Sequence, residues 1–198
     1  MTEVELELPT PVYGGTPLDY WGENLEPPSF KPRPPIVVPE GATNVAQDKP
    51  VTASSDLNYG ELEMIVDGDK EAAQSSVVEL KEGHQYVQID LGEEHEVYAI
   101  ALWHFHSAER VYFDVAVKLA DDAQFTEDVK TVFNNDHNNS SGIGVGEDKE
   151  YIESYKGQVI RTQEGVEGRY VRLYSNGNTS DDMNHYIEVE VYGVPVAK

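Results

Sequence analysis

Prolines are distributed very unevenly along this chain of 198 residues, and this limits what its first part can form. Nine of the eleven prolines precede residue 44. Because proline lacks a backbone N–H and has a fixed φ, residues 1–43 are predicted to form neither a helix nor a central strand of any length. We expect an extended, polyproline-like arm instead.

The proline-rich arm also carries aromatic side chains, which flexible linkers usually lack. These are Tyr13, Tyr20, Trp21 and Phe30, with aliphatic residues between them. An extended segment of this kind needs a surface on which to bury its apolar groups, either its own domain or another protein. We favour another protein, because proline lowers the entropy that a segment loses when it docks. The four aromatic residues are therefore predicted to bind a partner.

After residue 44 the sequence becomes rich in short segments with β character. Apolar and polar residues alternate, as in half-buried strands, in 86–91, 111–119 and 187–191. In 111–119 this pattern places Tyr112 on the face opposite Val111. Residues 97–103 are apolar on both faces, as expected of a strand that is covered on both sides. Short helical turns fit only 57–66 and 120–128. The pattern predicts an all-β sandwich with polar loops.

The charge of the chain excludes several kinds of partner. The formal net charge is -23, from 14 Lys and Arg against 37 Asp and Glu, and no basic cluster is present. Nucleic acids need a basic surface, and anionic lipids attract one, so neither is expected to bind. No apolar run approaches the roughly 20 residues that span a bilayer, so direct membrane insertion is not expected. With no cysteine, disulfides and cysteine zinc sites are excluded.

The first residues show no sign of an export signal. Residues 1–9 have neither a basic nor an apolar region of the signal-peptide type. If Met1 is the native start, the expectation is a cytoplasmic protein, or one held at the periphery of a membrane complex.

Five short stretches resemble, in order, the landmarks of discoidin domains, also called coagulation factor F5/8 type C domains. They are Asn44-Val-Ala-Gln-Asp-Lys-Pro-Val-Thr-Ala-Ser-Ser55, Ile65-Val-Asp-Gly-Asp69, Tyr86-Val-Gln-Ile-Asp-Leu-Gly92, Gly168-Arg-Tyr-Val-Arg-Leu-Tyr174 and Ile187-Glu-Val-Glu-Val-Tyr-Gly193. Together they span residues 44–193, roughly three-quarters of the chain. Each stretch is weakly specific alone, but five in register are fairly specific.

The resemblance implies a galactose-binding-like jelly roll of about eight strands in 44–198, preceded by the arm at 1–43. Members of the family usually lack catalytic activity and bind sugars, lipid head groups, collagen or other proteins through loops at one end. Their first and last strands usually lie side by side. We therefore expect the arm to emerge beside the C-terminus and away from those loops.

The resemblance also implies a calcium site. In many sugar-binding relatives, loop carbonyls, an Asp of the Asp-Gly-Asp motif and a Glu near the last strand hold this cation. The matching positions here are Asp67, Asp69 or Glu71, joined by Glu188. Calcium prefers six to eight oxygen ligands, which carboxylates and carbonyls supply. The alternative is a solvated turn, because Asp-Gly is also a strong turn signal.

Histidines and asparagines near the expected loops are candidate ligand residues. The candidates are His104, His106, Asn135, His137, Asn178 and His185. Because strand side chains repeat every two residues, the first two histidines share a face and could bind a transition metal with one of the others. They could instead line a sugar or partner site, or form a polar strand end packed under loops.

Catalysis is not expected from this sequence, because no nucleophile stands in a motif with its base. Asp90 and Arg172 both fall in well-matched β segments, and we expect them to form a structural ion pair.

Two non-enzymatic functions follow. The first is an interaction subunit that docks on a larger protein complex, which could be associated with a membrane, through the arm and the sandwich surface. The second is a calcium-stabilised carbohydrate-binding module. We favour the first, because the arm is long and aromatic and because sugar-binding modules tend to present exposed aromatics in their loops, where this chain has His and Asn.

Overall fold

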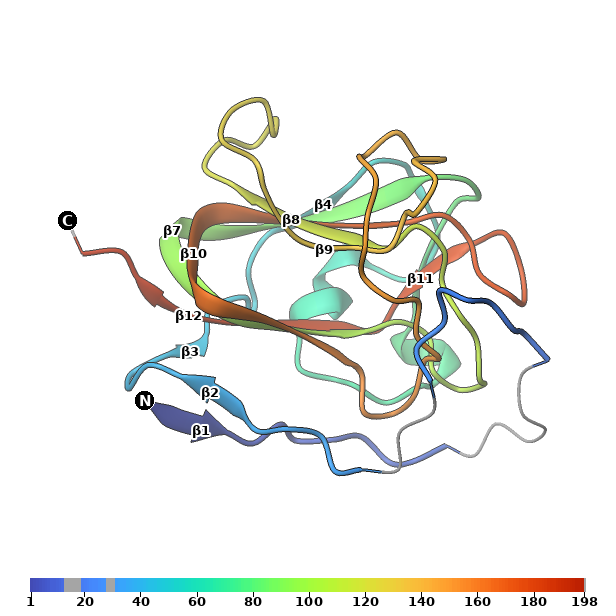
Figure 1. Cartoon of the computed structure of the whole chain (residues 1–198), viewed down its shortest axis with the longest axis horizontal. Coiled ribbons are helices and arrows are strands. Elements are labelled where there is room, and N and C mark those ends of the chain that lie inside the picture. Colours follow the sequence, from blue (N-terminus) through green and yellow to red (C-terminus); the bar gives the residue numbers. More distant parts are fainter. Residues whose placement is uncertain (13–18, 28–30, 198) are drawn as a thin grey trace.

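The computed structural model describes residues 1–12, 19–27 and 31–197, so Tyr13 and Phe30 of the arm lie outside the described residues. The described chain forms strands and two short 3-10 helices, η1 (Leu62–Val66) and η2 (Gln74–Ser76) (Figure 1). The strands are β1 (Thr2–Val4), β2 (Ile36–Val38), β3 (Thr43–Asn44), β4 (Val51–Ala53), β5 (Leu57–Tyr59), β6 (Val78–Leu80), β7 (Gln85–Trp103), β8 (Ala116–Ala120), β9 (Lys130–Asn134), β10 (Gln158–Ser175), β11 (Asn184–Tyr186) and β12 (Glu188–Pro195). None of these described elements is a helix long and apolar enough to cross a membrane.

The strands form an antiparallel sandwich. The main sheet has seven strands, in the order β3-β12-β7-β10-β8-β9 with β4 paired to the first half of β7. A second sheet has the order β11-β6-β5. The two segments predicted as separate strands, 86–91 and 97–103, belong to the single long strand β7, which pairs with β10 along most of its length. The predicted all-β sandwich is thus confirmed.

Alternating residues of the long strands fill the core. Their side chains are buried on the inner face and interlock between the sheets, which is what a period of two produces. The members from the four central strands are Val87, Ile89, Leu91, Val97, Ile100, Leu102, Val117, Leu119, Ile160, Val171, Leu173, Val189 and Val191. Burial of this apolar surface is the main favourable term in folding.

The prediction for the start of the 111–119 segment was wrong. Regular strand begins at Ala116 only, and Tyr112, which was expected on the outer face, is 1% exposed. The cause is Asp114, which adopts a left-handed conformation with a φ of 50°. A residue of this conformation interrupts the alternation, so the side chains before and after it no longer follow one strand period.

The predicted ion pair between Asp90 and Arg172 does not form. Asp90 pairs instead with Arg169, whose Nε lies 2.8 Å from Oδ1 of Asp90. Arg172 donates to Oε1 of Gln88 at 2.6 Å and lies over the ring of Phe125. A bulge between Gly168 and Tyr170 shifts the register of β10 against β7, which brings the earlier arginine to the aspartate.

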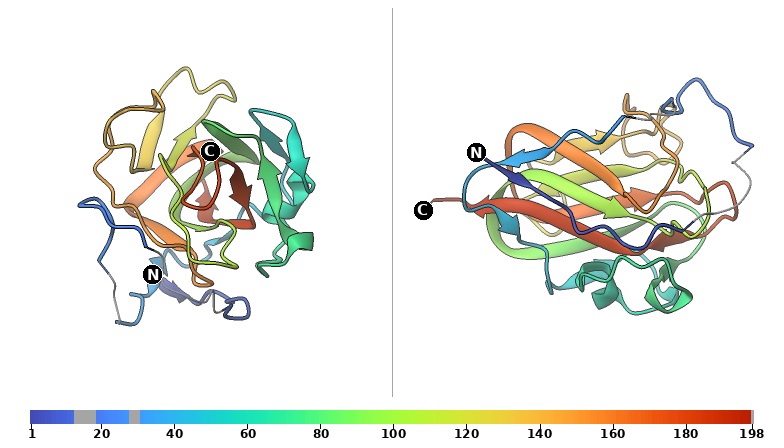
Figure 2. Two further views of the ribbon diagram at one scale, coloured as in Figure 1. Left: turned by 90° about the vertical axis from the view of Figure 1, so that its right-hand side faces the viewer. Right: turned by 90° about the horizontal axis from the view of Figure 1, so that it is seen from below.

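The first part of the arm lies along the outside of the sandwich (Figure 2). β1 pairs with β2, and Ile36 and Val38 of β2 are buried against Ala99 of β7. β3 pairs with β12, so the arm leaves the sandwich beside the C-terminal strand, as the resemblance implied.

Residues 19–27 of the arm contact the loop before β10. Tyr20 Oη donates to Oε2 of Glu150 at 3.0 Å, and the backbone N–H of Glu26 donates to the carbonyl of Glu150 at 2.7 Å. The ring of Tyr20 lies 5.9 Å from that of Phe113. The described part of the arm therefore packs on its own domain, which was the less favoured of the two alternatives, while Trp21 is 82% exposed.

Candidate functional site

Several loops meet at the end of the sandwich that lies away from the two termini (Figure 1). The side chain of Asn184 donates to the carbonyls of Lys81 and Gly83, both at 2.8 Å, and joins the turn before β7 to the loop after β10. The backbone N–H of Phe113 donates to the carbonyl of Gly177 at 3.0 Å. These contacts hold the loop 81–84, the loop 104–115 and the loop 176–183 together. We call this surface the loop end.

Asp114 is the central polar group of the loop end. Its Oδ2 accepts hydrogen bonds from Ser140 Oγ at 2.8 Å, Ser141 Oγ at 2.6 Å and Asn176 Nδ2 at 2.9 Å. One carboxylate oxygen thus ties the polar loop before β10 to the loop after it, which keeps both loops in a fixed shape. Sequence reasoning missed Asp114, because it occupies a polar position of an apparent strand.

A cavity of about 410 Å³ opens at the loop end between Glu82, Gly83, Asn176 and Asp182. The carboxylates and the amide on its wall are good acceptors and donors for hydroxyl groups. The ring of Phe113 links this region to the arm through its contact with Tyr20, and its carbonyl accepts from the N–H of Asn176 at 2.9 Å. The contact of Tyr20 therefore attaches the arm next to the loop end, and the adjoining residue Trp21 is exposed.

His84 is a second residue of this region that sequence reasoning missed. Its ring stacks on Tyr174 with the centroids 5.2 Å apart and the planes at 8°. Burial lowers the pKa of His84, and the nearby charges of Asp114 and Asp136 oppose that shift. Among the described residues, Nε2 of this ring has no hydrogen-bond partner. Its signal in the sequence is weak, because it is an isolated histidine in a turn.

The predicted histidines lie deeper than expected. Nδ1 of His104 lies 2.6 Å from Oε1 of Glu153, and neither side chain is exposed. His106 Nε2 lies 2.9 Å from the carbonyl of Lys70. The two ring nitrogens of His185 bond to Tyr112 and Glu79. All three histidines are 5% exposed or less. They do not converge on one point of the surface, and their role as ligand residues stays a prediction.

The remaining candidates serve their own loops. Asn135 is 2% exposed, and its Oδ1 accepts from the N–H of Val115 at 2.7 Å. Asn178 donates to Asp181 Oδ1 at 2.8 Å and to the carbonyl of Met183 at 2.9 Å. His137 is half-buried beside them. Asn135 and Asn178 thus bond within their own loops, whereas Nε2 of His137 has no hydrogen-bond partner among the described residues.

The predicted calcium residues are linked by hydrogen bonds around the turn at Gly68, where Asp67 Oδ1 accepts from the N–H of Asp69 at 2.8 Å. The backbone N–H of Gly68 donates to Oε2 of the fully buried Glu188 at 3.1 Å, while Oε1 of Glu188 has no partner among the described residues. Burial raises the pKa of Glu188 to about 9, and the charges of Glu190 and Asp67 act in the same direction. A cation beside Glu188 and Asp67 would stabilise the ionised form of both carboxyls.

Asp69 and Glu71 use their side chains within the protein. Asp69 accepts from the N–H of Glu71 at 3.0 Å and from Ser76 Oγ at 2.7 Å, and Glu71 accepts from Thr10 of the arm. In the described part of the chain, no group of three or more His, Cys, Asp or Glu side chains is arranged to hold a metal ion. A cation at Glu188 would therefore take most of its ligands from backbone carbonyls.

Comparison with known protein families assigns most of the sandwich to one family. The F5/8 type C domain family matches residues 50–189. The chain belongs to this family. The match covers most of the sandwich as a single F5/8 type C domain and excludes the arm, and no curated protein matches the chain closely enough to be reported.

Solved structures of F5/8-like domains share this jelly roll. The family 32 carbohydrate-binding module of AlyQ, in complex with 4,5-unsaturated mannuronic acid, is 20% identical with a TM-score of 0.52, over 73% of this chain and 95% of that one. The family 32 module of C. perfringens NanJ, in complex with galactose, is 12% identical with a TM-score of 0.53, over 76% and 97%. A fucose-binding module of Streptococcus pneumoniae, SpX-3, is 19% identical with a TM-score of 0.53, over the same shares.

Some matches are much larger proteins. The chain spans 15% of the length of a family 89 glycoside hydrolase from Clostridium perfringens, at 18% identity and a TM-score of 0.58 over 77% of this chain. At these identities the likeness shows the fold alone. The fold predicted from the five sequence landmarks is therefore confirmed, as a jelly roll of the carbohydrate-binding-module type.

Proposed function

We propose that this F5/8 type C domain is a non-catalytic carbohydrate-binding module that binds sugar at the loop end. The observation that carries the proposal is the cavity of amides and carboxylates at the loop end, together with the exposed Trp21, whose neighbour Tyr20 contacts Phe113 of the same end. A large apolar side chain with 82% of its surface in water gains free energy when a ligand covers it. The sugar-bound modules that share the fold support the same ligand class.

The two kinds of surface match the two sides of a sugar ring. The C–H face of a pyranose stacks on an indole ring, and its hydroxyls pair with groups that both donate and accept. Around the cavity of about 410 Å³, the Asn176 amide both donates and accepts, and the carboxylates of Glu82 and Asp182 accept. The arm thus provides the exposed aromatic side chain that the loops of the sandwich themselves lack.

Calcium is proposed as a structural ion of the module, held by Asp67 and Glu188 together with backbone carbonyls. The partnerless Oε1 of Glu188 supports this proposal. The ion would neutralise the two carboxylates and fix the turn at Gly68 against β12.

The alternative function, a subunit that docks on a protein complex through the arm, has less support. The apolar residues of β2 that were expected to need a foreign surface, such as Val38, are buried on their own sandwich. Among the described arm residues, Trp21 is the aromatic side chain with most of its surface free for a partner.

A glycan array probed with the full chain tests the proposal, followed by titration calorimetry with the best glycan. Trp21→Ala should weaken binding at least tenfold, because it removes the stacking surface. Tyr170→Ala, which truncates a half-buried aromatic residue farther along β10, is the matched control and should bind like the wild type. Absence of binding to any glycan, with co-purification of a stoichiometric protein partner from the native source, would favour the docking subunit instead.

A further inference from the structure

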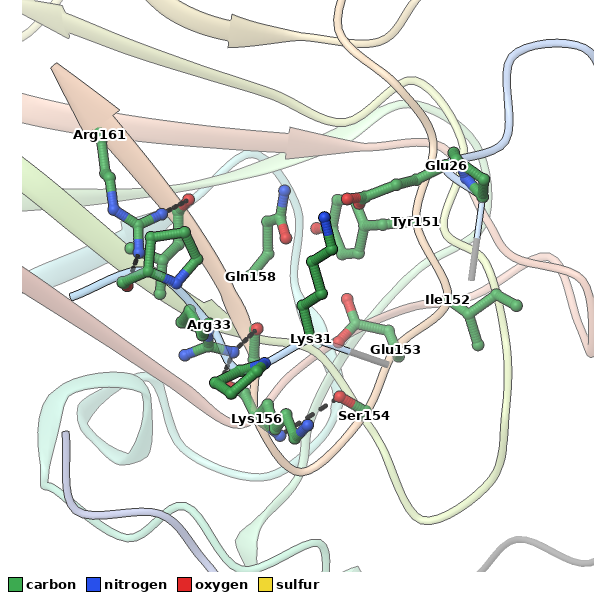
Figure 3. A pocket seen from close by; sticks show the side chains of 15 residues that line it. Glu26, Lys31, Arg33, Tyr151, Ile152, Glu153, Ser154, Lys156, Gln158 and Arg161 are labelled. Atoms are coloured by element: carbon green, nitrogen blue, oxygen red, sulfur yellow. Dashed lines mark hydrogen bonds between the residues drawn. The ribbon is translucent and has the colours of Figure 1, made fainter. Parts of the chain in front are cut away.

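A second cavity, of about 370 Å³, lies between the arm and the segment that leads into β10 (Figure 3). Residues 31–34 form the arm side of this cavity, and residues 151–161 form the sandwich side. Four of the fourteen Lys and Arg residues of the chain line it, namely Lys31, Arg33, Lys156 and Arg161. In a protein with a net charge of -23, this is a local reversal of charge. We call it the arm pocket.

Three of these cations lack a carboxylate partner. Among the described residues, no ion pair involves Arg33, Lys156 or Arg161, although the chain has 37 acidic residues. Elsewhere in the described chain some cations are paired, for example Lys70 with Glu190 and Arg169 with Asp90, while others such as Arg172 bond to neutral oxygens. Cations that a strongly acidic chain leaves unpaired, side by side, form a site that attracts an anion.

The two guanidinium groups are held in place by backbone carbonyls. Arg33 donates to the carbonyls of Lys156 and Gly157, the latter at 2.7 Å, and Arg161 donates to the carbonyl of Pro34 at 2.7 Å. Burial lowers the pKa of both arginines, and the charge of Arg161 lowers that of Arg33 further. Each guanidinium has five N–H groups, so further donors remain for a ligand.

The turn that carries these carbonyls is rigid. Gly157 has a φ of 63°, and a Cβ at this position would lie 2.6 Å from the ring of Trp103. The indole Nε1 of Trp103 donates to the carbonyl of Tyr155 at 3.0 Å. The sandwich side of the arm pocket is therefore preorganised, which lowers the entropy lost on binding.

Other lining groups favour a ligand that is only partly anionic. The amide of Gln158 makes no hydrogen bond to another described residue, and Figure 3 shows it among the side chains of the pocket. The rings of Pro32 and Pro34 offer apolar surface. Glu26 at the rim and the buried Glu153 are acidic, so a compact polyanion would meet repulsion, whereas hydroxyl groups could donate to Glu26.

We infer that the arm pocket is a second binding site, for a sugar that carries one carboxylate, such as a uronic acid residue of an acidic polysaccharide. The carboxylate would lie against Arg33, Lys156 and Arg161, and the ring hydroxyls would meet Gln158 and Glu26. The volume suits one or two sugar rings. That the ligand is a saccharide rests on the proposed function, whereas the preference for an anion rests on the unpaired cations alone.

The test titrates the full chain with trigalacturonate, with the uncharged galactotriose and with inorganic phosphate, by calorimetry. Trigalacturonate should bind at least tenfold more tightly than the other two, and more weakly at high salt. Lys156→Gln should weaken its binding about fivefold, and Arg161→Gln about tenfold. Lys130→Gln is the matched control. It removes one positive charge on β9, outside the lining of the arm pocket, and should bind trigalacturonate like the wild type. Arg161→Gln also removes the bond to the Pro34 carbonyl and could loosen the arm. Lys156→Gln changes an exposed side chain and should keep the melting temperature of the wild type, so it tests the pocket without that effect.

Trp21→Ala separates this inference from the proposed function. If trigalacturonate binding survives in Trp21→Ala and falls in Lys156→Gln, the arm pocket is a site of its own. If trigalacturonate binding is lost in Trp21→Ala and unchanged in the pocket variants, the acidic sugar binds at the loop end and the second site is refuted. Equal binding of phosphate would also refute the inference, because the pocket would then recognise anions without regard to the sugar.

Discussion

Nδ1 of His104 lies 2.6 Å from Oε1 of Glu153, in a part of the sandwich where neither side chain reaches solvent. His104 is the residue that follows β7, and Glu153 lies in the loop before β10. The imidazole also stacks on Tyr112, with the ring centroids 4.2 Å apart. This buried pair therefore joins the main sheet to the loop that forms one side of the arm pocket.

Removing one partner of this pair should be destabilising. Glu153→Ala leaves Nδ1 of His104 buried without its partner, and a buried polar group without its hydrogen bond typically costs about 1–3 kcal/mol. Urea unfolding of the variant measures the loss. Glu147→Ala, in the exposed part of the same loop, is the control and should stay within about 0.5 kcal/mol of the wild type. A loss below about 1 kcal/mol for Glu153→Ala would mean that the pair contributes little.

His185 should make the stability of the domain depend on pH. Its Nδ1 lies 3.0 Å from Tyr112 Oη and its Nε2 lies 3.1 Å from Glu79 Oε2, which fits a neutral ring that accepts at one nitrogen and donates at the other. Burial lowers the pKa of His185, and Arg110 lowers it further, while Asp181 and Glu79 oppose the shift. In the unfolded chain this histidine binds a proton near pH 6.5, whereas in the native state it does so only at lower pH. The free energy of unfolding therefore falls as the pH drops below about 6.5.

The measurement is the free energy of unfolding in urea between pH 7.5 and 5. His185 should account for a slope of up to about 1.4 kcal/mol per pH unit below pH 6.5. His185→Gln keeps one donor and one acceptor but cannot titrate, so its profile should be flatter than that of the wild type. Parallel profiles would show that the histidine is protonated equally in both states.

The sequence predicted those parts of the fold that depend on local pattern. The alternation in 86–91 and 187–191 places Val87, Ile89 and Val191 in the core, as observed, because a strand period of two needs no distant information. The pairing of Asp90 was predicted wrongly, because a bulge in β10 decides which arginine meets it. Bulges and left-handed residues such as Asp114 depend on tertiary hydrogen bonds, which a sequence pattern does not contain.

The candidate sites were harder to predict, because they combine segments that are far apart in the chain. Trp21 was recognised as an unusual arm residue, but its place beside the loop end depends on contacts of Tyr20 with Glu150 and Phe113, which lie 130 and 93 residues later. The arm pocket depends in the same way on Arg33 meeting the turn at Gly157. Such pairs can be identified only when the path of the arm over the sandwich is known. The proline content predicted that the arm is extended, but not which surface it follows.

Glu188 should report whether calcium binds. Without metal, its raised pKa keeps it protonated in the native state while the unfolded carboxyl ionises near pH 4.5. The native state then holds more protons, so stability should fall as the pH rises from about 4.5 to 9 in EDTA. Glu188→Gln should remove this fall. Calcium at pH 8 should raise the melting temperature of the wild type and leave that of Glu188→Gln unchanged. An unchanged wild-type midpoint with calcium and with EDTA would eliminate the ion.

Both proposed sites depend on the attachment of the arm to the sandwich. Val38 is fully buried against the sandwich, whereas Val37, its neighbour in β2, is 44% exposed. Val38→Ala removes two buried methyl groups and should lower the free energy of unfolding by about 1–2 kcal/mol, whereas Val37→Ala should change it by less than about 0.5 kcal/mol. Urea titration of the two variants measures the difference.

Deleting residues 1–38 extends the same argument to function. The deletion uncovers Ala99 and removes Trp21 together with Arg33, so the remaining domain should be less stable and should lose most of its glycan binding. The docking-subunit hypothesis predicts instead that the deletion abolishes assembly with a partner complex. If the shortened domain keeps the melting temperature and the glycan affinity of the full chain, then the arm contributes to neither, and the loop end must bind sugar through its polar loops without Trp21.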